Sequence, residues 1–148
     1  MKKTIIRKSV KTEIKNEIPF LLNKVLNYMK TKYEDVNFDN AEYIFSAGYN
    51  RSRYFRNDKG KNTKYSNPNV CICTRAKLML YDKRSLKMKN RIVFVGSNIQ
   101  IESALVHELT HHVQYERNER CGNELDTTKN ELEYLKENYP KYYKKIMT

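Results

Sequence analysis

The sequence predicts an α+β fold in a single domain spanning residues 1–148, and three observations support this. The length suits one domain and is sufficient to bury a sizeable core. Near the start of the chain and over its last third, apolar residues recur every three or four positions, as in helices that pack on one face. Between these segments lie short runs of β-branched and aromatic residues, typical of strands. We therefore expect a small mixed or antiparallel sheet packed against helices.

The first helix is expected to begin near Thr12, with Thr12 as its cap and Glu13 in its first turn. Pro19 falls inside it and is expected to kink or restart it. We interpret its apolar stripe as a face that packs into the core. The stripe consists of Ile14, Ile18, Leu21, Leu22, Val25, Leu26 and Met29.

The strands are expected in the middle of the chain. Residues 43–45 read as a short strand that ends before Gly48, and residues 60–68 read as a loop. Residues 70–73 suggest a strand, residues 76–81 a strand or a helix, and residues 91–95 a strand that ends at Gly96. Ser97 or Asn98 can then cap the next helix.

That next helix contains the motif His-Glu-x-x-His at His107, Glu108 and His111. Since an α-helix turns about 100° and rises about 1.5 Å per residue, the two imidazoles lie roughly 40° and about 6 Å apart on one face. This spacing lets both bind one Zn²⁺, at Zn–N distances near 2.0–2.1 Å. The carboxylate of Glu108 lies at the edge of that face, where it can take a proton from a metal-bound water.

Apolar residues lie on nearly every side of this helix, which indicates that it is buried. They are Ile101, Ala104, Leu105, Val106, Leu109 and Val113. Buried imidazoles and carboxylates are costly without partners, and a metal ion supplies them. The alternative is a pair of core histidines that are satisfied by hydrogen bonds.

The segment resembles the active-site helix of the zincin metallopeptidases, and the likeness extends over about a fifth of the chain, residues 105–135. A strand leading directly into the motif helix is also the order found in zincins. The resemblance implies a compact, gluzincin-like enzyme of the small cytoplasmic or phage type that hydrolyses peptide bonds with Zn²⁺. It implies His107 and His111 as metal ligands and Glu108 as the general base, and a tyrosine is expected to stabilise the oxyanion.

The third ligand is expected to be a carboxylate, because no histidine follows His112 and His112 points about 100° away from His111. If the next helix returns alongside the motif helix, Glu131 reaches the level of His111, with Glu124 as the alternative and Asp126 facing solvent. Cys121 is a further, less favoured candidate. The resemblance agrees with Glu131, since gluzincins carry Asn-Glu about twenty residues after the second motif histidine.

In gluzincins, an acid four positions after the glutamate ligand orients a histidine ligand. That position is Leu135 here, so this contact must be missing or come from elsewhere. The final helix is expected to start at an Asn123 cap, to end at Pro140 and to be followed by a basic, aromatic tail. Its inward stripe is expected to be Leu125, Thr128, Leu132 and Leu135.

The net charge of +12 suggests a nucleic acid or another polyanion as a partner; the alternative is compositional, since the chain is rich in Lys, Asn, Ile and Tyr together. The densest basic stretch, residues 51–64, is interleaved with aromatics, and we interpret it as a solvated loop. Two alternatives to a peptidase therefore stay open. One is a nucleic-acid-associated protein, such as a protease of DNA-bound proteins, and the other is a non-catalytic domain stabilised by zinc.

The odd number of cysteines, Cys71, Cys73 and Cys121, suggests reduced thiols and a cytoplasmic location. Cys71 and Cys73 are expected to share one face of a strand. No apolar run approaches the roughly 18 residues of a membrane span, and charges return too early at the start for a secretory signal. The sequence does not indicate the peptide substrate or the oligomeric state.

Overall fold

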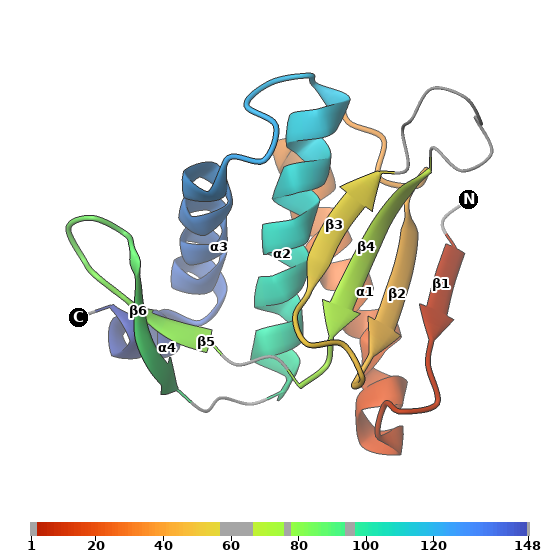
Figure 1. Cartoon of the computed structure of the whole chain (residues 1–148), viewed down its shortest axis with the longest axis horizontal. Coiled ribbons are helices and arrows are strands. Elements are labelled where there is room, and N and C mark those ends of the chain that lie inside the picture. The colour runs from red at the N-terminus through yellow and green to blue at the C-terminus, as the bar shows by residue number, and fades with distance from the viewer. Residues whose placement is uncertain (1–2, 57–66, 76–77, 94–96, 148) are drawn as a thin grey trace.

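The computed structural model describes residues 3–56, 67–75, 78–93 and 97–147. A four-stranded sheet lies at one end of the molecule, a two-stranded sheet lies at the other, and helices lie between and behind them (Figure 1). In chain order the elements are β1 (Lys3–Ile6), α1 (Thr12–Lys32), β2 (Glu42–Ser46), β3 (Arg53–Arg56), β4 (Pro68–Cys73), β5 (Leu78–Tyr81), β6 (Met88–Val93), α2 (Ser97–Glu116), α3 (Glu124–Asn138) and α4 (Pro140–Ile146). The predicted α+β class is confirmed.

The larger sheet is mixed and has the strand order β1-β2-β4-β3. Strands β1, β2 and β4 run parallel, and β3 pairs antiparallel with β4 at the edge. Because side chains alternate across a strand, Tyr43, Phe45, Val70 and Ile72 enter the core together, and all four are fully buried. Neighbouring positions on β4 place the two cysteines Cys71 and Cys73 on the other face, as expected, and both thiols are free.

Helix α1 begins at Thr12, as predicted, although Lys11 occupies the cap position and makes no side-chain capping bond. Pro19 does not restart the helix. It lies on the exposed side, while Ile18 and Leu22 are buried in the core beside it. These core contacts hold the helix across the position where the proline lacks an N–H donor.

Helix α2 is buried, as predicted, because it packs against α1, β3 and β4 on one side and α3 on the other. Ile101, Leu105, Val106 and Leu109 have no exposed surface. The helix ends at Glu116. Several of its buried polar side chains have partners, such as Glu102, whose carboxylate accepts hydrogen bonds from the hydroxyls of Tyr134 and Tyr139.

Helix α3 starts at the predicted cap, where Asn123 Oδ1 accepts a hydrogen bond of 3.0 Å from the Asp126 amide. The predicted inward stripe is wrong at Leu125, which is 49% exposed. The reason is that α3 turns polar side chains toward α2: Asn130 donates to Thr110 Oγ1 at 2.8 Å, and Glu131 is buried as well. This rotation leaves Leu125 outside.

The C-terminal tail is not irregular, because Pro140 opens the short helix α4. A proline is well tolerated there, since the first residues of a helix lack N–H partners in any case. Strand β5 confirms the strand reading of residues 78–81, and β6 starts earlier than expected, at Met88. Residues 76–77 and 94–96 of the predicted elements lie outside the described residues.

Two strands were not predicted, β1 and β3. Strand β3 lies within the stretch interpreted as a basic loop, so that interpretation is wrong for residues 53–56. Residues 57–66, which hold the rest of that stretch and most of the predicted loop 60–68, lie outside the described residues. Among the helices that the structure describes, none combines the length and the apolar character that crossing a membrane requires.

Candidate metal centre

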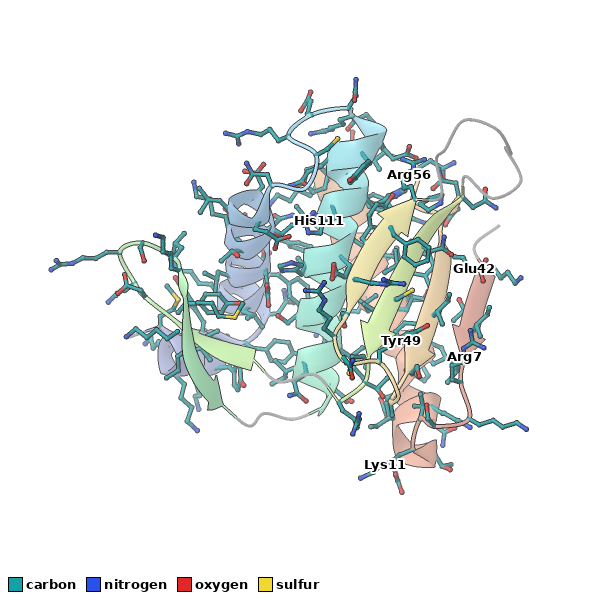
Figure 2. The ribbon with its side chains drawn as sticks, viewed as in Figure 1. Arg7, Lys11, Glu42, Tyr49, Arg56 and His111 are labelled. Atoms are coloured by element: carbon teal, nitrogen blue, oxygen red, sulfur yellow. The ribbon has the colours of Figure 1, made fainter. Side chains whose placement is uncertain are left out.

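His107 and His111 lie on the side of α2 that faces α3, since each contacts a carboxylate of α3. Their ring centroids are 5.4 Å apart. Figure 2 labels His111 between the two helices. One ligand atom from each of His107, Glu108 and His111 can be chosen so that all three lie within 4.8 Å of one another. The one-turn spacing of the motif therefore brings the two imidazoles together, as the sequence predicts.

Glu124, the first residue of α3, lies at the outer nitrogens of both rings. Its Oε2 is 3.1 Å from His107 Nε2, and its Oε1 is 2.9 Å from His111 Nε2. One carboxylate thus spans two imidazoles, and each contact of this length requires a shared proton when no metal is bound. A cation placed among these three groups would replace those protons.

Glu131 lies on the opposite side of His107. Its Oε2 is 3.0 Å from His107 Nδ1, and its Oε1 accepts a hydrogen bond from the Ser103 hydroxyl. Tyr81 on β5 is a third neighbour of this carboxylate. Glu131 is therefore buried among donors and orients the ring of His107. In gluzincins an acid at the position of Leu135 makes such an orienting contact, and the sequence offered no candidate for it.

The two glutamates contact different nitrogens of the imidazoles: Glu131 lies at Nδ1 of His107, and Glu124 lies at the Nε2 atoms of both rings. Which of the two is the third ligand stays a prediction. Asp126 pairs with Arg120 at 2.9 Å, away from the imidazoles, as expected. The Cys121 thiol donates to the carbonyl of Gln114 at 3.5 Å.

The tautomer of His111 follows from its contact with Gln114. The Gln114 Nε2 group donates to the carbonyl of Asn123 at 2.9 Å, and a carbonyl can only accept. The amide oxygen of Gln114 must then face His111 Nδ1, 3.0 Å away, so Nδ1 carries the proton. Nε2 is consequently the nitrogen through which His111 could bind a metal, which would displace the proton shared with Glu124.

His112 has the opposite tautomer and is no ligand. Its Nε2 lies 2.8 Å from the carbonyl of Asn37 and must donate to it, while Nδ1 accepts from the Tyr54 hydroxyl at 2.9 Å. Burial lowers the pKa of His112, which keeps the ring neutral. The prediction that this side chain points away from the site is confirmed, and its role is to tie α2 to β3.

The electrostatics of the site favour a cation. Burial raises the pKa of Glu108 to about 7, and the charges of Glu124 and Glu131 act in the same direction. Burial alone would lower the pKa of His107, but the hydrogen bond and charge of Glu131, with the charges of Glu108 and Glu124, raise it to about 9. Three carboxylates thus surround two imidazoles, and positive charge is stabilised among them.

The chain therefore fits a metal ion on its donor chemistry: two imidazole nitrogens and one carboxylate converge, and each ligand ring is oriented through its other nitrogen. Sequence reasoning missed Ser103, Gln114 and Tyr81. Ser103 lies four residues before His107 and Gln114 three residues after His111, so both share the ligands' helix face, and this spacing could have identified them. Nothing in the sequence links Tyr81 to the motif.

Comparisons of the chain with protein-family models, with curated proteins and with solved structures give no match.

Proposed function

We propose that the protein is a zinc-dependent metallopeptidase. The observation that supports this best is the convergence of Glu124 on the Nε2 atoms of both His107 and His111. In this proposal Glu124 is the third ligand, in place of Glu131. A Zn²⁺ ion held by these residues would polarise a substrate carbonyl and lower the pKa of a bound water towards about 7.

The residues of the chain then have distinct tasks. Glu108 accepts a proton from the attacking water and delivers it to the leaving amine, and burial keeps its pKa near the range in which a base can do both. Glu131 and Gln114 hold the two imidazoles in position. The tyrosine that is expected to stabilise the oxyanion stays a prediction.

The peptide substrate and the cytoplasmic location rest on the sequence, through the resemblance of the motif to zincins and the free cysteines. A structural zinc site would instead close its fourth position with another protein ligand. The Cys121 thiol, which donates a hydrogen bond to the Gln114 carbonyl, is the natural candidate for that ligand. A structural site would have no use for the buried acid Glu108 beside the imidazoles.

The test is the variant Glu108→Gln, loaded with one equivalent of Zn²⁺ and assayed on a quenched-fluorescence peptide library. We expect it to bind zinc with unchanged stoichiometry and to lose peptide hydrolysis by about 10²–10⁴-fold, the contribution of a general base. Glu17→Gln, at an exposed position of α1, is the matched control and should keep full activity. Equal turnover by Glu108→Gln and the wild type would refute the proposal.

A further inference from the structure

Half of the net charge of the protein is carried by two short segments. Residues 82–89 and 136–147 hold eight basic and two acidic side chains, a net charge of +6 out of +12. The bases are Lys83, Arg84, Lys87, Lys89, Lys136, Lys141, Lys144 and Lys145, and the acids are Asp82 and Glu137. We call these two segments the basic lobe.

The fold gathers the basic lobe from distant parts of the sequence. The first segment is the turn of the β5–β6 hairpin with the start of β6, and the second is the end of α3 with α4. Leu80 and Tyr81 pack against Ile146 in one apolar cluster, and Tyr81 forms a β-bridge with Met147. Hairpin and α4 therefore lie together at the end of the molecule opposite β1 (Figure 1).

All eight bases are exposed. Outside the lobe, several basic side chains are held in ion pairs, such as Lys30 with Asp39 and Arg117 with Asp35. Within it, hydrogen bonds from Ser85 and, to a smaller extent, the charge of Lys89 lower the pKa of the Asp82 carboxyl. Asp82 is held within the hairpin, since its Oδ1 accepts from the amides of Arg84 and Ser85 at 3.0 and 2.8 Å. The lobe therefore presents positive charge to solvent on a turn that is fixed by its own hydrogen bonds.

We propose that the basic lobe binds the phosphate backbone of double-stranded DNA, without sequence preference. Neutralising phosphates releases counterions, and this drives non-specific binding to DNA. A two-stranded β-ribbon has the width of the major groove, so the hairpin can enter it while α4 contacts the adjacent backbone. A membrane surface fits less well, because Met88 is the one exposed large apolar side chain of the lobe among the described residues.

The proposal does not depend on the metal centre or on peptidase activity. It predicts a dissociation constant of about 10⁻⁴–10⁻⁶ M at physiological salt, which weakens steeply as salt is raised. Each phosphate contact contributes about −0.9 to the slope of log K against log salt concentration. Removing three contacts should therefore make the slope less negative by about 2 to 3.

The experiment is fluorescence anisotropy of a labelled 20-base-pair duplex with the full chain. One variant neutralises the hairpin (K83Q/R84Q/K87Q) and a second neutralises α4 (K141Q/K144Q/K145Q). The control (K3Q/K8Q/K11Q) makes the same change in net charge at the other end of the molecule, where Figure 2 labels Lys11. We expect each lobe variant to bind at least 10-fold more weakly and with the reduced slope, and the control to change less than 3-fold.

Equal weakening by the control triple would overturn the proposal, since binding would then follow net charge alone. Absence of duplex binding at 50 mM salt would also overturn it, and so would binding to phosphatidylserine vesicles without binding to DNA. A second measurement works on the wild type and needs no variant to fold. Acetylation of Lys83, Lys87, Lys141 and Lys144 should slow when duplex is added, while acetylation of Lys8 and Lys11 should not.

Discussion

Replacing Glu124 and Glu131 separately by glutamine should distinguish a metal ligand from a residue that orients one. Glu124 meets the Nε2 atoms of both imidazoles, whereas Glu131 meets the Nδ1 atom of His107. Loss of an orienting partner typically costs 10–100-fold in metal affinity. We therefore expect Glu131→Gln to weaken zinc binding within that range and Glu124→Gln to weaken it by more than about 100-fold, or about 2.7 kcal/mol.

Stability should respond in the opposite order. The Glu124 side chain is 69% exposed, so a neutral amide there leaves the metal-free fold unchanged. The Glu131 side chain is only 5% exposed and accepts from Ser103 and His107. An amide in its place turns an NH₂ group toward one of these donors, and the unsatisfied contact should cost about 1–3 kcal/mol.

Zinc affinity can be measured by competition with a chromophoric chelator, and the free energy of unfolding by urea titration of the metal-free proteins. Asp126→Asn is the matched control, because Asp126 is on the same helix but pairs with Arg120. It should leave zinc affinity unchanged. If Glu131→Gln lost more affinity than Glu124→Gln, the assignment of the two carboxylates would be refuted.

Three further predictions concern the surroundings of the site and the surface. Gln114→Leu should weaken zinc binding about 10–100-fold in the chelator assay, because a ligand imidazole loses the group that fixes its tautomer; unchanged affinity would exclude that role. Tyr54→Phe should destabilise the protein by about 1–3 kcal/mol in urea while zinc affinity stays the same, since it leaves His112 Nδ1 unsatisfied and His112 is no ligand. Arg117 lowers the pKa of Asp35, so this pair stabilises the fold above the ordinary aspartate pKa and ceases to do so as pH falls through the lowered value. The deficit in stability of Asp35→Asn at pH 7 should therefore vanish in strong acid, and a deficit that persists there would argue against this linkage.

The sequence predicts the motif helix well because its signals are local. Two imidazoles four residues apart share a face in any α-helix, and apolar residues on every side indicate burial regardless of the fold around them. The Asn123 cap of α3 is a local signal of the same kind, and the structure agrees with it.

The imidazole nitrogens that Glu124 and Glu131 contact could not be predicted, because these contacts depend on how α3 is rotated against α2. The apolar pattern suggested that Leu125 faces inward, but buried hydrogen bonds of Asn130 and Glu131 decide the rotation instead. These bonds join residues of two helices, and periodicity within one helix contains no information about them.

The missed strand β3 has a different cause. Its side chains alternate between Tyr54 and Arg56, which contact α2, and Arg53 and Phe55, which are exposed. The inward-facing Arg56 is half-buried through its aliphatic stem, while the apolar Phe55 faces outward. The sequence of this edge strand therefore shows no alternation of apolar and polar residues. Pairing with β4, rather than local preference, defines this strand.

The most direct test of the metal centre is zinc K-edge X-ray absorption of the full chain loaded with one equivalent of Zn²⁺. We expect two imidazole nitrogens, with oxygen atoms making up the rest of the coordination sphere and no sulfur. A sulfur neighbour at about 2.3 Å would indicate a closed site that includes a cysteine. Failure of the purified protein to retain zinc would contradict the account altogether.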